Sequence, residues 1–98
     1  MNTLHLLNKS PFLGNTFDTV LAFIHEHDGI LLTGDAVYAL QPNTVFLMKM
    51  KQLPVTIYAL NEDMAARAID STLDNIKTVD YSAFVRLCTE YKKVVTWS

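Results

Sequence analysis

Five short apolar runs, separated by segments with helical spacing, constrain the fold of this chain more than any other feature of its sequence. Each run is apolar at most positions and is built largely from β-branched, leucine or aromatic residues, without strict alternation of apolar and polar side chains. The runs cover residues 3–7, 29–33, 55–60, 76–79 and 94–97. Near-continuous apolar runs are typical of strands that are covered on both faces. The pattern therefore predicts a buried, mainly parallel sheet.

The segments between the runs predict the helices that connect these strands. In residues 15–27 apolar side chains recur at helical spacing, with Asn15 as a suitable N-cap and Gly29 as a stop. A later helix is expected to open at Asn61, whose side chain would cap it, and is continued by a run rich in alanine. The last helix is expected to start at Asp80.

The segment 35–51 is the ambiguous one. Asn43 could cap a short helix there, whereas residues 48–51 alternate like an edge strand; we interpret the segment as helical. The whole chain then follows the order β-α-β-α-β-α-β-α-β. This order predicts an α/β fold of three layers, α/β/α, with a five-stranded, mainly parallel sheet and right-handed crossovers. A length of 98 residues is expected to form one domain, residues 1–98.

Composition and charge argue against several functional classes. Only 18% of the residues are charged and half are hydrophobic, which excludes intrinsic disorder. The formal charge is −2, and the only basic neighbours are Lys49 with Lys51 and Lys92 with Lys93, so no direct binding to nucleic acid is expected. No apolar run approaches the roughly 18 residues of a membrane span. With no recognisable signal peptide, the chain is expected in the cytoplasm.

Ligands of open parallel sheets bind beyond the carboxyl ends of the strands, so the residues there are the first candidates for chemistry. Ser10 has no base beside it in sequence that would make it a nucleophile, and we interpret it as the start of a helix or turn. Phe12 and Leu13 argue against a phosphate cradle in the same loop. Asp35 and Asp63 could pair for acid–base work, but we favour a simpler reading. In this simpler interpretation, Asp63 interacts favourably with the positive end of a helix dipole, and Asp35 ends a strand in a turn.

The histidines and the single cysteine also favour structural roles. His25 and His27 stand two apart on an expected helix, which points them to nearly opposite sides and suits no metal. Their place in a last turn fits compensation of the helix dipole. His5 lies inside a strand and is interpreted as a structural histidine. Cys88 shares the apolar stripe of the last helix and is expected to behave as a small hydrophobe.

An ordered set of motifs over the whole chain resembles one family. The motifs are Tyr58-Ala59-Leu60-Asn61-Glu62-Asp63 followed by Ala66-Arg67, His5, Asn8-Lys9-Ser10-Pro11-Phe12, Val79-Asp80-Tyr81, Phe84-Val85-Arg86-Leu87, Trp97 and the segment Asp35 to Tyr38-Ala39. Together they resemble the TusB/DsrH branch of the DsrE/DsrF/DsrH-like sulfur-relay family. The resemblance implies a five-stranded parallel sheet flanked by helices.

The same resemblance implies partners and a role. TusC-like and TusD-like paralogues would assemble with this chain as a heterohexamer with two copies of each subunit, and the TusD-like subunit would carry the working cysteine. Sulfur would pass from a TusA-like donor toward a TusE-like acceptor, ending in 2-thiolation of a tRNA wobble uridine. TusB-like chains need no active thiol. We therefore interpret this chain as a non-catalytic subunit without cofactor or metal.

Two positions depart from the family pattern. Val20 occupies what looks like the place of a cysteine in the first helix of DsrH proteins, which removes the case for a relay thiol there. Ala68 stands where many relatives have glycine after the Ala-Arg pair, and we expect a slightly different backbone at that helix end.

Partner-facing residues are predicted from surplus apolar side chains and from the family motifs. The apolar side chains around residue 46 cannot all face one core from a short segment, although an unusually well-filled core is the alternative. The candidates are Phe46, Met48, Met50, Asp35, Tyr38, Asn61, Glu62, Asp63 and Arg67. Two alternative functions remain open: a persulfide carrier that uses Cys88, and a flavodoxin-like binder of a small ligand.

Overall fold

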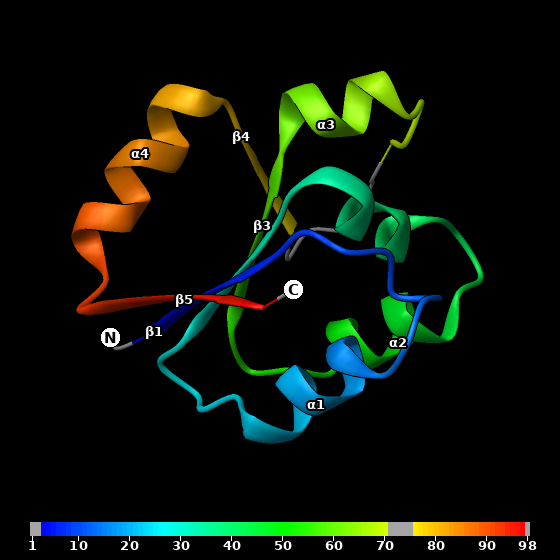
Figure 1. Ribbon diagram of the computed structural model, residues 1–98, viewed down its shortest axis with the longest axis horizontal. Helices are drawn as coiled ribbons and strands as arrows, with labels where there is room; N and C mark the ends of the chain where they lie inside the picture. Colours follow the sequence, from blue (N-terminus) through cyan, green and yellow to red (C-terminus); the bar gives the residue numbers. More distant parts are fainter. Residues whose placement is uncertain (1–2, 71–75, 98) are drawn as a thin grey trace.

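All strand pairings in the protein's sheet are parallel. The computed structural model describes residues 3–70 and 76–97. Five strands form one sheet in the order β4-β3-β2-β1-β5 (Figure 1). They are β1 (Thr3–Leu7), β2 (Gly29–Leu32), β3 (Thr56–Leu60), β4 (Ile76–Val79) and β5 (Lys93–Trp97). The predicted α/β fold with a five-stranded parallel sheet is confirmed.

The connections between the strands are short helices. They are α1 (Thr16–Phe23), the 3₁₀ helix η1 (Gly34–Leu40), α2 (Val45–Lys51), α3 (Asn61–Ala66) and α4 (Tyr81–Glu90). From β1 to β4 the chain always steps in the same direction across the sheet, whereas α4 carries it back past three strands to β5. Right-handed crossovers then require α4 on the face opposite the other helices.

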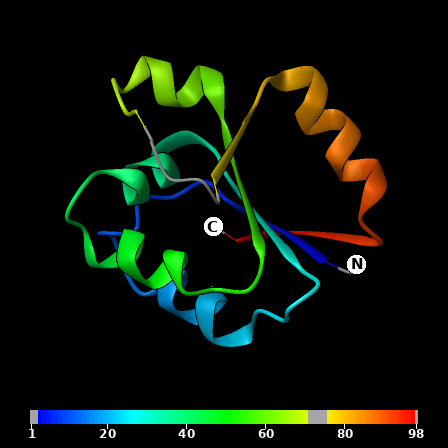
Figure 2. The ribbon, with the colours of Figure 1, turned by 180° about the vertical axis from the view of Figure 1, so that it is seen from behind.

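The helical layers on the two faces of the sheet differ in size, as two apolar clusters show. Leu7, Ile30 and Ile57 of the sheet pack with Val20 of α1, Val37 of η1, Met50 of α2 and Met64 of α3 in the larger cluster. On the other face, α4 alone contributes, with Leu87 packing on Leu4 and Leu31. Figures 1 and 2 show α4 apart from α1 and α2, on the far side of the sheet. One helical layer is therefore thick and the other is a single helix.

Helix α1 is shorter than the sequence predicts. It ends at Phe23, because Ile24 is extended, and Phe23 is 64% exposed. The following residues form a turn in which the Asp28 N–H donates to the His25 carbonyl (3.0 Å). His25 and His27 therefore lie in a turn before β2, and their expected role at a helix end was wrong. Gly29 is the first residue of β2, where a Cβ would overlap the Tyr91 hydroxyl.

Residues 35–51 divide into η1 and α2, which confirms the helical interpretation. The cap of α2 is Thr44 and not Asn43: the Thr44 Oγ1 accepts a hydrogen bond from the Leu47 N–H (3.1 Å). Helix α3 has Leu60 at its N-cap position, so the expected capping by Asn61 was also wrong. Asp80 does cap α4, where its Oδ1 accepts from the Ala83 N–H at 2.8 Å.

The end of α3 has the hydrogen bonds of a Schellman motif. The Ile69 N–H donates to the Met64 carbonyl (2.9 Å) and the Ala68 N–H to the Ala65 carbonyl (3.2 Å). Such a motif places its next-to-last residue in the left-handed region, and Ala68 has a φ of 53°. Ala68 thus adopts a conformation that favours glycine, and the helix end is formed regardless of the missing glycine.

Candidate functional site

Four of the predicted partner-facing residues meet at the carboxyl edge of the sheet. Asp35 and Tyr38 lie on η1, which follows β2, whereas Asp63 and Arg67 lie at α3, which follows β3. The Arg67 guanidinium reaches Asp35 Oδ1 from Nη2 at 2.9 Å and from Nε at 3.0 Å. Its Cζ lies 5.9 Å from the centre of the Tyr38 ring. Because β2 and β3 are parallel neighbours, their carboxyl ends bring these side chains together.

Arg67 separates the two carboxylates of this group, which we call the Arg67 cluster: Asp35, Tyr38, Asp63 and Arg67. Its Nη1 donates to the Asp63 carbonyl at 3.2 Å and lies 3.9 Å from Asp63 Oδ1. Asp63 Oδ2 accepts a hydrogen bond from the Gly34 N–H at 2.6 Å. The cluster thus joins η1 to α3, with the Asp35 carboxylate bound by Arg67 and the Asp63 carboxylate bound by the Gly34 N–H.

The remaining predicted partner residues divide between surface and core. Asn61 and Glu62 are exposed on the first turn of α3. On α2, Met48 is 60% exposed, whereas Met50 is 0% exposed and packs in the larger cluster. Residues two apart on a helix point in nearly opposite directions, so the two methionines cannot share one face. Met50 was therefore wrongly predicted as a partner-facing residue.

Phe46 links the core to an exposed aromatic side chain. Its ring packs edge-on against Phe17, which is buried, with 5.2 Å between ring centres. On the other side it packs edge-on against Phe12, 5.5 Å away, which is 57% exposed. Phe12 belongs to the turn after β1, where its N–H donates to the Ser10 Oγ at 3.2 Å, as the expected turn at Ser10 requires.

Cys88 lies on α4, away from the carboxyl edge of the sheet. It is half-buried and packs with the smaller cluster beside Leu4, Leu31 and Leu87. Burial raises the pKa of the Cys88 thiol above its usual value. A thiol reacts as its thiolate, so this environment lowers its nucleophilicity. Val20 is fully buried in α1.

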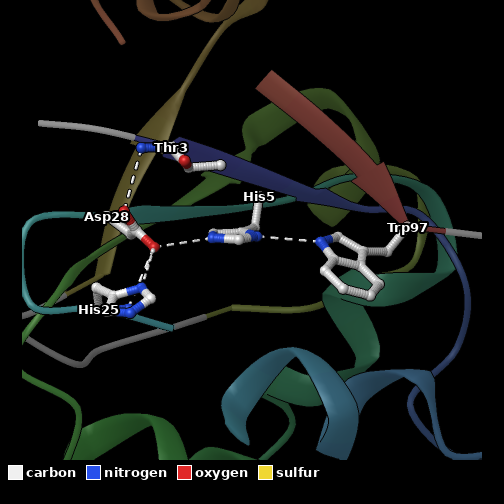
Figure 3. A network of polar contacts seen from close by, with 5 residues as sticks. All are labelled: Thr3, His5, His25, Asp28 and Trp97. Carbon is white, nitrogen blue, oxygen red and sulfur yellow. Dashed lines mark hydrogen bonds and ion pairs between the residues drawn. The ribbon is translucent and has the colours of Figure 1, made fainter. Parts of the chain in front are cut away.

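A network of polar contacts connects β1, β5 and the turn before β2 around His5, which is buried on β1 (Figure 3). Trp97 Nε1 donates a hydrogen bond to His5 Nδ1 at 3.0 Å, because an indole nitrogen is only a donor. The proton of the neutral imidazole is then on Nε2, which donates to Asp28 Oδ2 at 3.0 Å. His5 is thus satisfied on both nitrogens, and its interpretation as a structural histidine is confirmed.

Asp28 is the residue that the sequence analysis missed. It lies just before β2 and is 6% exposed. It accepts hydrogen bonds from the Thr3 N–H (3.1 Å) and the His25 N–H (3.2 Å) as well as from His5. Burial raises its pKa, but the hydrogen bonds outweigh that effect, so the pKa of Asp28 is lowered overall. An acidic residue directly before an apolar strand was the sequence signal that could have found it.

Neither a metal-holding group of side chains nor a membrane-spanning helix is present in the described residues. Within 3–70 and 76–97, no three His, Cys, Asp or Glu side chains converge closely enough to hold a metal ion. His25 and His27 extend largely into solvent, and His25 Nδ1 lies 3.7 Å from Asp28 Oδ2. In the same two stretches, every helix is too short or too polar to cross a bilayer.

The fold belongs to a class of α/β proteins with a known structural example. The crystal structure of the ychN protein from Escherichia coli matches this chain with a TM-score of 0.75 at 18% identity, covering 98% of this chain and 99% of that one. The particular family follows from the sequence: the family described as DsrH like protein matches residues 9–94, and the chain belongs to it.

Relatives in that family confirm the resemblance. The chain is 36% identical over 95 residues to Protein TusB from Escherichia coli O81 (strain ED1a), and this covers 96% of the chain and 99% of the relative. It shows the same identity and coverage to Protein TusB from Shigella sonnei (strain Ss046). The similarity thus extends over nearly the full length of both proteins.

Proposed function

We propose that this chain is a non-catalytic subunit of a sulfur-relay complex that supports 2-thiolation of a tRNA wobble uridine. TusC-like and TusD-like paralogues are its partners, a TusA-like protein supplies persulfide sulfur, and a TusE-like protein accepts it. Membership of the DsrH-like family and the similarity to TusB proteins support the relay. The division of labour within the complex is argued from the chain's own residues.

The placement of the only cysteine carries this proposal. Sulfur transfer needs a thiolate that a donor protein can reach, and Cys88 is half-buried with a raised pKa. The carboxyl edge of the sheet holds the Arg67 cluster instead of a thiol. Val20 of α1, which the family resemblance places where DsrH proteins have a cysteine, is a buried aliphatic residue. A partner must therefore provide the sulfur carrier.

The partner-facing surface is proposed at the same edge. The Arg67 cluster, with Asn61 and Glu62, offers charged and polar groups there, and we extend the surface to α2, where Phe46 is partly exposed and Met48 is exposed. Interfaces are enriched in aromatic residues, Met and Arg, and Phe46, Met48 and Arg67 are of these types. Met48→Glu should reduce co-purification of the paralogues, whereas Val85→Glu, at an equally exposed position on α4, should not. Loss of the complex with both variants, or with neither, would contradict this assignment.

The proposed function is tested in cells that lack this chain. Complementation with the native chain and with Cys88→Ala should restore the 2-thiouridine content of tRNA equally. Co-purification with the TusC-like and TusD-like subunits shows that both forms assemble. Lost thiolation in Cys88→Ala with an intact complex, or a mass gain of one sulfur atom on Cys88, would favour the persulfide carrier instead.

A further inference from the structure

A cleft of about 610 Å³ lies at the amino-terminal edge of the sheet. The turn before β2, the segment before β3 and the end of α4 line it. Strands β2 and β3 are parallel, so this edge is opposite the one that carries the Arg67 cluster. The cleft is therefore separate from the partner surface proposed above.

The lining of the cleft is negatively charged. Its charged lining consists of the exposed carboxylates of Glu26 and Glu90 and the buried carboxylate of Asp28, which already accepts three hydrogen bonds; His27 also lines it, and among the described residues neither lysine nor arginine does. Glu90 is also the last residue of α4, where the helix dipole adds partial negative charge. The Glu26 Oε1 atom lies 3.5 Å from Nε2 of the neighbouring His27, and both side chains are largely exposed. Such a concave negative surface attracts a cation.

The floor and one wall of the cleft suit a long cationic side chain. Tyr58 and Tyr91 line it with their hydroxyl oxygens 3.3 Å apart. Burial, followed by the hydrogen bond with Tyr58, raises the pKa of Tyr91, so the Tyr91 phenol stays neutral at physiological pH. Leu53, Pro54 and Val55 add an apolar wall. Apolar walls accommodate the aliphatic stem of arginine or lysine, while aromatic rings and carboxylates bind the charged head.

We propose that this cleft binds an arginine side chain presented by a partner protein. Arginine is favoured over lysine because its planar guanidinium can contact carboxylates in a bidentate manner and pack on tyrosine rings. The chain's own arginines do not supply it: Arg67 is held by Asp35, and neither Arg67 nor Arg86 lines the cleft. Charge complementarity thus calls for a second protein.

The test is an NMR titration of the full chain with two blocked tripeptides, acetyl-Gly-Arg-Gly-amide and its citrulline counterpart. Citrulline keeps the shape of arginine but is neutral. We expect saturable shifts of the amides of Asp28, Thr56 and Tyr91, with the arginine peptide bound about tenfold more tightly. Added salt should weaken the binding of the arginine peptide but not that of the citrulline peptide.

Variants of the two exposed carboxylates locate the binding site. Glu26→Gln with Glu90→Gln should reduce arginine affinity to that of citrulline. Asp18→Asn with Asp70→Asn, exposed acids outside the cleft, makes the same change in net charge and should leave the affinity unchanged. Thermal unfolding tests whether each variant is folded. If the double cleft variant is not folded, the single variant Glu90→Gln is used in its place.

Three outcomes would overturn the proposal. They are equal affinity for the arginine and citrulline peptides, undiminished affinity in the folded cleft variant, and the lack of saturable shifts at the cleft residues. The measurement involves no sulfur chemistry. A negative result therefore leaves the proposed relay function in place, and failure of the relay test does not affect this one.

Discussion

Replacing Ala68 by glycine should stabilise this protein, although glycine usually destabilises helical segments. Ala68 follows the last turn of α3 with a φ of 53°, in the left-handed region where a Cβ crowds the backbone. Its N–H and that of Ile69 already make the two hydrogen bonds of the Schellman motif. Glycine at this position would keep these bonds and remove the strain.

The magnitude follows from two opposing effects. Relief of the left-handed conformation is worth about 1–2 kcal/mol, and the greater freedom of glycine in the unfolded chain costs about 0.4–1 kcal/mol. The net gain is about 0.5–1 kcal/mol in the free energy of unfolding. With an unfolding entropy of about 2.1 cal/mol/K per residue, a chain of 98 residues should gain roughly 2–5 °C in Tm.

Thermal unfolding followed by circular dichroism measures this change. Ala65→Gly is the matched control, because Ala65 is exposed within the same helix and its replacement should cost about 0.5–1 kcal/mol. The two substitutions, three residues apart, are therefore expected to shift Tm in opposite directions. If Ala68→Gly lowers Tm as Ala65→Gly does, the reasoning from the left-handed conformation is refuted.

Three further predictions concern the buried polar and sulfur atoms. Trp97→Phe removes the donor to His5 Nδ1 and should cost about 1–3 kcal/mol in urea unfolding; an unchanged midpoint would contradict it. The pKa of Asp28 is lowered from 3.8, so its carboxylate contributes stability above about pH 4 that is lost as the pH falls through the folded value. Asp28→Asn should flatten this acid limb of the stability profile. Cys88→Ala should cost about 1 kcal/mol, and alkylation of Cys88 should still accelerate above pH 9.0, its usual pKa; a plateau below that pH would disprove the burial argument.

The His5 network explains how the edge strand β5 is fixed. Most residues of β5 are exposed, so apolar burial contributes little to its attachment. Its pairing with β1 and the bond from Trp97 to His5 fix it instead. Through Asp28 the same histidine reaches the turn before β2. The network therefore extends from the turn before β2, which lines the cleft, to β5.

Much of the fold could be predicted from the sequence because its signals are local. The apolar runs identified the strands to within one residue at each end, and the start of the last helix was placed correctly at Asp80, whose side chain accepts a hydrogen bond from the N–H three residues on. Helix α1 was predicted too long, since apolar spacing alone does not reveal the turn that Asp28 closes after Phe23. Met50 was misplaced because helical spacing shows which residues share a face and not which face is buried.

The sequence by itself determined the alternating strands and helices and the family. It also showed that Cys88 is the single cysteine of the given sequence. Only the tertiary structure decided which polar groups meet. Arg67 and Asp35 are 32 residues apart, and Trp97 and His5 are 92 apart. The physical reason is that local spacing sets the direction of each side chain, whereas the order and register of parallel strands set its neighbours. That order is a property of the whole chain, since it depends on every crossover packing its helix against the sheet.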